Sequence, residues 1–260
     1  MKLSICPAAA GAAEAAALIV AQQLAAKPES VLGLPTGRTS LGIYEEIVRL
    51  HAAGRADFSR AHTCNLDEFI GLTSQDRRSY CAFMEKHLFR RVNIPPSHVH
   101  FLNGQAEDVD EECLRYERLI DSLGGIDLQL LGVGANGHIG FNEPGRALRA
   151  RTHRATLTRG TRRSNTGLFS GRLRAVPREA LSMGMATILE ASAIVLVAMG
   201  RTKAKAVQSL FTGRVSTASP VSFLQLHPDV HVIVDRAAAA KLPQSLRELS
   251  PGPPATVEVL

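Results

Sequence analysis

Short apolar runs alternate along the chain with longer segments of helical character. The apolar runs are continuous rather than alternating, which is typical of strands that helices cover on both faces. They lie at residues 31–34, 61–66, 126–133, 193–199 and 230–234. Helix-length segments lie between them, at residues 41–51, 80–91, 107–123 and 203–210. This order predicts an α/β fold with an open, mostly parallel sheet and helices on both faces, a Rossmann-like three-layer sandwich.

One stretch departs from this alternation. Residues 149–180 are rich in arginine and show weak periodicity, so we expect a mobile helical flap there. Neither a repeat nor a linker divides the rest of the chain, which predicts a single α/β domain over residues 1–260. An apolar, alanine-rich segment at residues 8–26 is interrupted by polar side chains. We interpret it as an amphipathic helix rather than a signal peptide or a membrane span.

Composition and charge narrow the function classes. The formal net charge of +6 suits an anionic ligand. The basic stretch lacks interleaved aromatic residues and zinc-finger spacing, so we expect no nucleic-acid partner, and we likewise expect no membrane partner. The four cysteines are scattered, without the spacing of a metal site. In a chain of 260 residues with a full core, they favour reduced thiols and a cytoplasmic location.

Four polar clusters directly follow predicted strands. The carboxyl ends of parallel strands line one crevice of an open sheet, and ligands bind there. The clusters are residues 35–39 (PTGRT), 67–68 (DE), 134–138 (GANGH) and 200–203 (GRTK). We therefore expect them to converge on one site.

The first cluster has the features of a phosphate-binding turn. Its small residues let the backbone approach an anion, and the helix that follows directs N–H groups towards it. Lys203 opens another helix after a strand, where it adds a positive charge to the same phosphate. Taken alone, the first cluster is explained equally well as a tight turn without a ligand. The candidate substrate-binding residues are Pro35, Thr36, Gly37, Arg38, Thr39 and Lys203.

The third cluster belongs to a loop rich in groups for proton transfer. Residues 132–137 match the G-x-G-x-x-G pattern of a dinucleotide site, but no helix follows and no acidic residue ends a later strand at the required distance. A histidine such as His138 can act in proton transfer near neutral pH, and Glu143 lies five residues later. Asp67, at another strand end, can serve as a base. A histidine alone in a loop is more often structural, but glycines and nearby carboxylates favour a catalytic role here.

These motifs resemble those of the glucosamine-6-phosphate deaminase (isomerase) family and, more distantly, of 6-phosphogluconolactonase. The matching segments extend over nearly the whole chain, and NLDEF and GHIGFNEP are the most specific of them. The segments are residues 32–39 (LGLPTGRT), 65–72 (NLDEFIGL), 79–84 (SYCAFM), 102–104 (LNG), 131–144 (LGVGANGHIGFNEP) and 224–228 (LQLHP).

The resemblance implies an enzyme without a metal or organic cofactor, which converts glucosamine 6-phosphate to fructose 6-phosphate and ammonia. By motif position Asp67 matches the base that moves a proton between C2 and C1 of the sugar, and His138 matches the residue that helps to open the ring. Glu143 matches the carboxylate partner of that histidine, and Asn136 is expected to orient the ring. Residues 36–39 and Lys203 match parts of the phosphate site.

Three positions depart from the family pattern. Asn136 replaces an aspartate that many members carry, and Arg38 replaces the second glycine of the phosphate turn. Gly167 stands where the flap of the family supplies an arginine to the phosphate. We hypothesise that Arg38 supplies the missing charge, or that Arg162 or Arg163 does so by a shift in register.

Alternative functions stay open at this point. One is a catalytically altered or inactive sugar-phosphate-binding or regulatory protein, and others are a galactosamine-6-phosphate deaminase/isomerase or a lactonase. Release of ammonia distinguishes the deaminases from the lactonase and from other aldose–ketose isomerases. The expected partner is a small amino-sugar phosphate, and the sequence leaves a homo-oligomer open.

Overall fold

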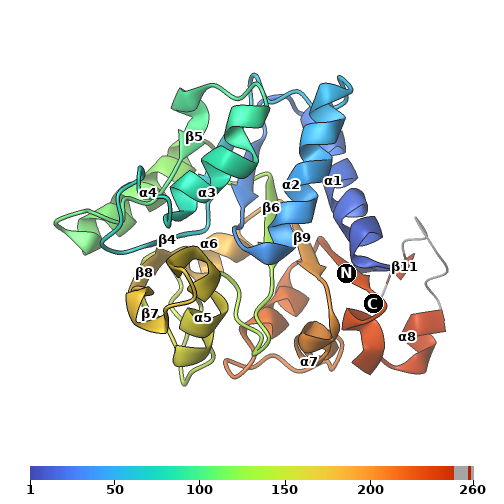
Figure 1. Ribbon diagram of the computed structural model, residues 1–260. Coiled ribbons are helices and arrows are strands. Elements are labelled where there is room, and N and C mark those ends of the chain that lie inside the picture. Colours follow the sequence, from blue (N-terminus) through green and yellow to red (C-terminus); the bar gives the residue numbers. More distant parts are fainter. Residues whose placement is uncertain (249–256, 259–260) are drawn as a thin grey trace.

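The structure is a computed structural model that describes residues 1–248 and 257–258. Its main sheet consists of β1 (Lys2–Cys6), β2 (Val31–Leu34), β3 (His62–Asn65), β5 (Val99–His100), β6 (Leu128–Gly132), β9 (Ala193–Ala198), β10 (Val230–Asp235) and β11 (Val257–Glu258). Within the described residues these eight strands are ordered β11-β1-β10-β9-β6-β2-β3-β5 (Figure 1). Every neighbouring pair is parallel except β11 and β1. The predicted open, mostly parallel sheet is confirmed.

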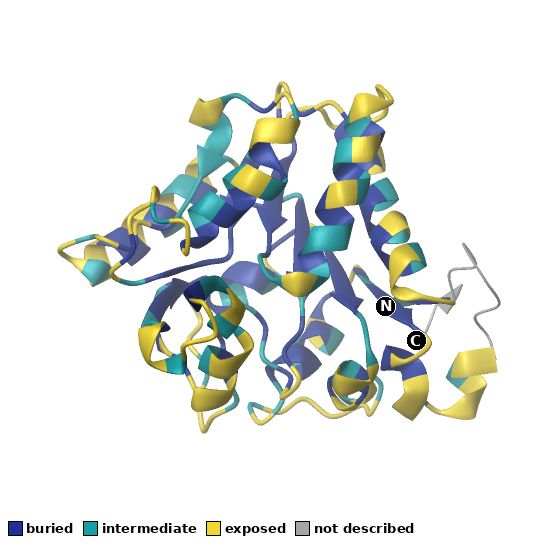
Figure 2. Ribbon diagram, viewed as in Figure 1, coloured by how far each residue is buried: buried dark blue, intermediate teal, exposed yellow. Residues whose placement is uncertain are grey.

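Helices cover both faces of this sheet, as predicted. The described α-helices are α1 (Ala9–Ala26), α2 (Arg38–Ala52), α3 (Tyr80–His87), α4 (Val109–Ser122), α5 (Arg159–Ser164), α6 (Met185–Leu189), α7 (Ala204–Ser209) and α8 (Gln244–Glu248), of which α5 lies in the predicted flap rather than on this sheet. On one face α1, α2 and α3 share a core with Val195 and Val197, and on the other α4, α6 and α7 share a core with Ile194 and Leu196. Successive residues of β9 therefore point into two cores, which makes the strand continuously apolar. Figure 2 shows the buried strands between helices whose outer faces are exposed.

Helix α1 accounts for the apolar N-terminal segment. Among the described residues it is the helix long and apolar enough to cross a membrane, with 18 residues and a mean hydropathy of 1.3. Its buried face packs in the core that it shares with α2 and the sheet, and consists of Ala12, Ala13, Ala16, Ala17, Val20, Ala21 and Leu24. The small side chains let the two helices approach closely, since a Cβ added at Gly42 would lie 3.4 Å from the Cβ of Ala13. This packing is that of a core helix.

A second, smaller sheet holds the flap. It consists of β4 (Asp67–Phe69), β7 (His153–Thr156) and β8 (Glu179–Ser182), antiparallel in the order β4-β8-β7. The predicted helical flap is therefore only partly helical, because strands enclose α5 and two 3-10 turns at both ends. These strands are short and carry no alternating apolar pattern, so the sequence did not reveal them. The apolar side chains beneath the flap form a cluster of their own, which includes Phe69, Phe141 and Phe169.

Element boundaries next to the strand ends differ from the predictions. Helix α2 begins at Arg38 rather than at residue 41, and α7 begins only after a 3-10 turn (Arg201–Lys203). The predicted strand at 61–66 ends at Asn65, and Leu66 then passes the chain from the large sheet to the small one. The Leu66 N–H donates to the Leu34 carbonyl in β2, and its carbonyl accepts from the N–H of Met183 after β8. Asp67 consequently lies at the junction of the two sheets.

Candidate active site

The turn between β2 and α2 presents the start of a helix at the carboxyl end of the sheet. Gly37 is the N-cap residue and has a φ of 100°, a left-handed value that favours glycine. No described side chain caps this helix, because the Ser40 hydroxyl donates to the Gly37 carbonyl at 2.7 Å instead of accepting from an N–H group. The buried Tyr44 hydroxyl donates to the Pro35 carbonyl and holds the turn. The first N–H groups of α2 thus lack a capping side chain, as an anion site at a helix start requires.

Two cationic side chains beside this turn act on each other electrostatically. Arg38 is the exposed first residue of α2, and Lys203 is partly buried at the end of the turn that follows β9. Burial and then the positive charge of Arg38 lower the pKa of Lys203, and among the described residues no carboxylate contributes to its electrostatics. Thr36 and Thr39 are partly buried in the same turn. A bound anion offsets the repulsion between two such cations, so the arrangement suits a phosphate group.

Asp67 lies at the start of β4 with its carboxyl group buried. The residue is 7% exposed, and its Oδ1 atom is buried without a hydrogen-bond partner. Burial and then the charge of Glu68 raise the pKa of Asp67 to about 8. Burial and then the charge of Asp67 raise the pKa of Tyr44 and of Tyr80, so Asp67 lies close to the residues that support the 35–39 turn. A carboxyl group with an unpaired oxygen and a pKa near neutrality is suited to proton transfer.

The neighbouring Glu68 binds the backbone instead. Its Oε1 accepts hydrogen bonds from the N–H groups of Phe69 and Tyr80, and its Oε2 accepts one from the N–H group of Cys81. Glu68 therefore fastens the start of α3 to β4, while burial raises its pKa to about 7. Glu68 also lines a cavity of about 290 Å³, which none of the predicted site residues borders. Both carboxylate oxygens are already hydrogen-bonded, so they hold structure rather than a ligand there.

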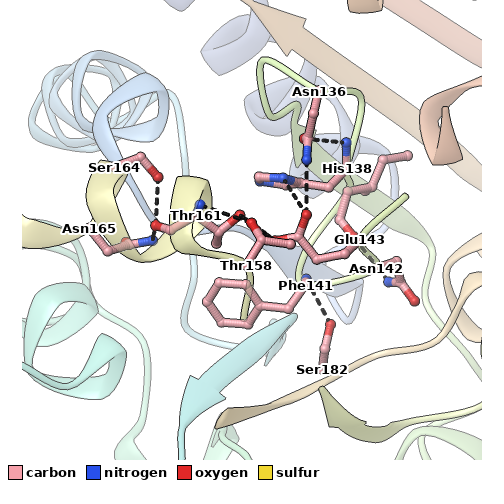
Figure 3. A network of polar contacts seen from close by, with 11 residues as sticks. Asn136, His138, Phe141, Asn142, Glu143, Thr158, Thr161, Ser164, Asn165 and Ser182 are labelled. Carbon is pink, nitrogen blue, oxygen red and sulfur yellow. Dashed lines mark hydrogen bonds and ion pairs between the residues drawn. The ribbon is translucent and has the colours of Figure 1, made fainter. Parts of the chain in front are cut away.

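The loop after β6 brings three predicted catalytic residues together (Figure 3). The Nδ1 atom of His138 lies 3.6 Å from Oε2 of Glu143, just beyond hydrogen-bond distance. Asn136 bridges the two, because its Nδ2 donates to Glu143 Oε2 at 2.9 Å and its Oδ1 accepts from the His138 backbone N–H at 3.2 Å. Burial alone would raise the pKa of Glu143, but His138, the Thr161 hydroxyl and the Asn136 amide lower it to about 2. Glu143 is thus an ionised group whose negative charge faces the imidazole.

The glycine that begins this loop has a packing role. A Cβ added at Gly134 would lie 2.3 Å from Cε1 and 2.4 Å from Nδ1 of His138, so the imidazole lies directly against the glycine backbone. By contrast, a Cβ at Gly132 would meet nothing within 4 Å. The literal match to a dinucleotide motif therefore has a different physical reason here, since only a residue without a side chain at 134 leaves room for the histidine ring.

Strand β8 links Asp67 to the histidine loop. Asp67 pairs with Ser182 in the small sheet, and Ser182 Oγ accepts a hydrogen bond from the N–H group of Phe141 at 3.0 Å. The same strand thus positions both parts of the site. In the described part of the chain no hydrogen bond or ion pair joins the Asp67 carboxyl group to His138 or Glu143. The two carboxylates are therefore separate groups that can carry separate steps.

The flap contributes two residues to the site that the sequence analysis missed. It also binds the side chain of one arginine that the sequence analysis considered for the phosphate. Thr158 and Thr161 both donate to Oε1 of Glu143, the first at 3.1 Å. Arg162 donates to backbone carbonyl oxygens of the flap at 2.9 Å, so its guanidinium is held inside the flap rather than offered to a phosphate. Gly167 is exposed, and a Cβ added there would meet nothing within 4 Å. Of the hypothesised arginines, Arg38 is the one whose charge lowers the pKa of Lys203.

Sequence comparison identifies the relatives of this chain. The profile of a family described as glucosamine-6-phosphate isomerases/6-phosphogluconolactonase matches residues 7–233. A glucosamine-6-phosphate deaminase of Thermoanaerobacter pseudethanolicus is 46% identical over 235 residues, which are 90% of this chain and 92% of the relative. Glucosamine-6-phosphate deaminase 1 of Bacillus subtilis is 44% identical over 243 residues, which are 94% of this chain and 100% of the relative.

Solved structures agree with the sequence comparison. A structure described as a monomeric glucosamine-6-phosphate deaminase is 44% identical and superposes with a TM-score of 0.90, covering 93% of this chain and 100% of the other. A 6-phosphogluconolactonase from Trypanosoma brucei is 17% identical with a TM-score of 0.68, covering 93% and 98%, which shows the common fold alone. From the family profile, the identities and the fold, we conclude that this chain belongs to the glucosamine-6-phosphate isomerase/6-phosphogluconolactonase family.

Proposed function

We propose that this protein is a glucosamine-6-phosphate deaminase, which converts glucosamine 6-phosphate to fructose 6-phosphate and ammonia. The observation that carries the proposal is the combination of Asp67, a buried carboxyl group with an unpaired oxygen, with the linked Asn136, Glu143 and His138. Relatives that are 44–48% identical are named for this activity. The fold and the charges at the 35–39 turn are consistent with a phosphorylated sugar.

The phosphate end of the substrate binds at the start of α2 in this proposal. The guanidinium of Arg38 offers parallel N–H donors to two phosphate oxygens, and Lys203 adds a point charge. Both groups lie beside the helix start, where backbone N–H groups also face an anion. Anchoring the phosphate orients the reacting carbons, so the chemical steps become effectively intramolecular.

His138 assists ring opening. The imidazole accepts the proton of the anomeric hydroxyl and delivers a proton to the ring oxygen, which leaves an aldehyde at C1. Glu143 is ionised and 3.6 Å from the imidazole, so it stabilises the transient positive charge on the ring. Asn136 holds the Glu143 carboxylate in place through its 2.9 Å hydrogen bond.

Asp67 carries the proton transfer that follows. As a carboxylate it removes the proton from C2 while the ammonium group of the substrate gives a proton to O1, which yields an enolamine with a hydroxyl at C1. Asp67 then returns its proton to C1, which leaves a protonated imine at C2. Water then hydrolyses the C2 imine to the ketose and ammonia. Since burial raises its pKa to about 8, Asp67 is a stronger base than an ordinary carboxylate. Positioned acid–base groups of this kind contribute about 10²–10⁴-fold to a rate.

A coupled assay for ammonia and fructose 6-phosphate tests the proposal. The wild-type protein should form both products in equal amounts from glucosamine 6-phosphate. Asp67→Asn should lose at least about 10²-fold in turnover, because an amide cannot accept the C2 proton, while binding of the sugar phosphate is kept. Undiminished ammonia release by this variant would remove Asp67 from the mechanism. Galactosamine 6-phosphate, assayed in parallel, decides the epimer.

A second candidate function is a sugar-phosphate-binding protein without turnover. It is favoured by the open position at Gly167 and by Arg38, whose guanidinium would then occupy the space of the phosphate. Calorimetric binding of a hexosamine phosphate without any release of ammonia decides for this alternative. A lactonase is distinguished in the same assay, because it releases no ammonia.

We further propose that a single chain forms a complete site. The 44% identical solved structure, which is described as monomeric, supports this proposal. We place the reaction in the cytoplasm, because the four cysteines are free thiols, as is usual in a reducing compartment.

A further inference from the structure

The flap contacts the catalytic loop at one carboxylate. The Thr161 hydroxyl donates to Oε1 of Glu143, and the Thr158 hydroxyl donates to the same oxygen at 3.1 Å (Figure 3). The other oxygen, Oε2, accepts from Asn136 and faces His138. Glu143 thus divides its two oxygens between the flap and the loop that carries the histidine.

The position of Thr161 depends on the flap as a whole. Thr161 is 3% exposed and lies in the first turn of α5, where its N–H group donates to the N-cap hydroxyl of Thr158 at 3.1 Å. At the other end of α5, Asn165 accepts a hydrogen bond from the buried Tyr80 hydroxyl at 2.9 Å, which fastens the helix to the main domain. The Thr161 hydroxyl therefore reaches Glu143 in the docked position of the flap.

We propose that Thr161 is a positioning residue, through which docking of the flap fixes the carboxylate of Glu143 and, with it, the imidazole of His138. This inference rests on the proposed function, in which His138 and Glu143 act in ring opening. A carboxylate held at both oxygens has a fixed plane, because rotation about its C–C bond breaks one of the two contacts. Hydrogen bonds to an ionised acceptor are roughly twice as strong as neutral ones, so the flap contact is a substantial constraint.

Together with His138, the same contact helps to keep Glu143 ionised. Among the described residues, the titratable group that acts on Glu143 is His138, whereas Thr158, Thr161 and Asn136 are uncharged. Burial raises the pKa of Glu143, and these partners together lower it to about 2. Loss of the Thr161 hydroxyl removes one of the stabilising groups, so the pKa of Glu143 rises. A protonated Glu143 no longer presents a negative charge to His138, so this charge is lost at a higher pH when the hydroxyl is absent.

Two substitutions at this position separate the hydroxyl from the size of the side chain. Thr161→Val removes the hydroxyl and keeps the branched shape, whereas Thr161→Ser keeps the hydroxyl. We expect kcat for ammonia release to fall about 10–100-fold in Thr161→Val, as for a lost hydrogen bond to a charged group, with Thr161→Ser close to wild type. Thr161→Ala also removes the hydroxyl and is measured in parallel. It should show the same loss of kcat even if the valine side chain is poorly accommodated.

A matched control lies in the same flap. The Thr166 hydroxyl donates to the Arg163 carbonyl at 2.9 Å and not to the active site, so Thr166→Val removes a flap hydroxyl at no cost to Glu143. Thermal unfolding of all variants checks that each is folded. Equal kcat values in Thr161→Val and Thr166→Val overturn the proposal, as does a loss in Thr161→Ser as large as that in Thr161→Val.

A measurement that does not depend on catalysis tests this inference separately from the proposed function. Carbon-detected NMR titration follows the Glu143 carboxyl group, and the His138 imidazole is followed in the same samples. The Glu143 midpoint should rise in Thr161→Val and stay at the wild-type value in Thr161→Ser and Thr166→Val. If the wild-type protein releases no ammonia but this pattern is found, the coupling stands and the proposed function fails. An unchanged midpoint in an active enzyme contradicts the coupling alone.

Discussion

Replacing Gly134 by alanine tests whether the position of the His138 ring limits catalysis. A Cβ at this position would lie 2.3 Å from Cε1 and 2.4 Å from Nδ1 of the imidazole, whereas ordinary contact begins at 3.4 Å. The ring therefore has to move by about 1 Å, a displacement of catalytic geometry that costs about 10²-fold in rate. The same movement changes the 3.6 Å separation from Glu143, so the stabilising charge is misplaced as well.

The expected effect on stability is smaller than the effect on activity. The clash involves the end of a side chain that can rotate rather than the backbone, so the fold accommodates it. Overpacking costs about 1–3 kcal/mol in general, and we expect Gly134→Ala at the lower end of that range. A protein that unfolds at nearly the wild-type temperature but has lost most of its kcat is the predicted combination.

The assay is steady-state release of ammonia from glucosamine 6-phosphate, with thermal unfolding of the same preparations. Gly132→Ala is the matched control, because a Cβ there meets nothing within 4 Å although the residue belongs to the same G-x-G motif. We expect wild-type kcat in the control and a loss of about 10²-fold in Gly134→Ala. A folded Gly134→Ala protein with wild-type kcat, or an equal loss in both variants, would refute the reasoning.

Charge substitutions test the other groups of the site. Arg38→Gly should raise KM about 10–100-fold with a smaller change in kcat, because one charge-assisted contact to the phosphate is lost. An unchanged KM would place Arg38 outside the phosphate site. For Asp67, the folded-state pKa of about 8 lies above the unfolded value of 3.8, so its contribution to stability is complete below pH of about 4 and is lost as the pH rises towards 8. Asp67→Asn should therefore exceed wild type in unfolding free energy at pH 8, on the order of a few kcal/mol, with the difference shrinking towards pH 4. Urea unfolding at both pH values measures this, and a difference independent of pH contradicts the buried carboxyl group.

Strands of the main sheet could be located from the sequence because their environment is uniform. Every residue of β9 after Ala193 is buried, alternately in one core or the other, so the apolar run is unbroken and easily recognised. The polar clusters were recognisable for a related reason, since they begin where such a run stops. Parallel topology then requires those strand ends to share one edge, which is why Arg38 and Lys203 were expected to converge.

Elements of the small sheet could not be located in this way. Strands β7 and β8 carry a mixture of polar and apolar residues over four positions each, a length too short for a period to stand out. Their pairing depends on β4, which is far away in the sequence and exists as a strand only because Leu66 redirects the chain. The start of α2 was misplaced because serine and threonine were expected to cap it, whereas Gly37 occupies the cap.

By itself the sequence determined the fold class, the edge of the sheet at which the candidate site lies and the family to which the chain belongs, because these depend on periodicity and on motifs local to the chain. Only the tertiary structure decided which side chains touch. It showed Thr158 and Thr161 on Glu143, Arg162 held within the flap and the imidazole against Gly134. Such contacts depend on how the two sheets and the flap pack against each other, and no local pattern encodes that packing.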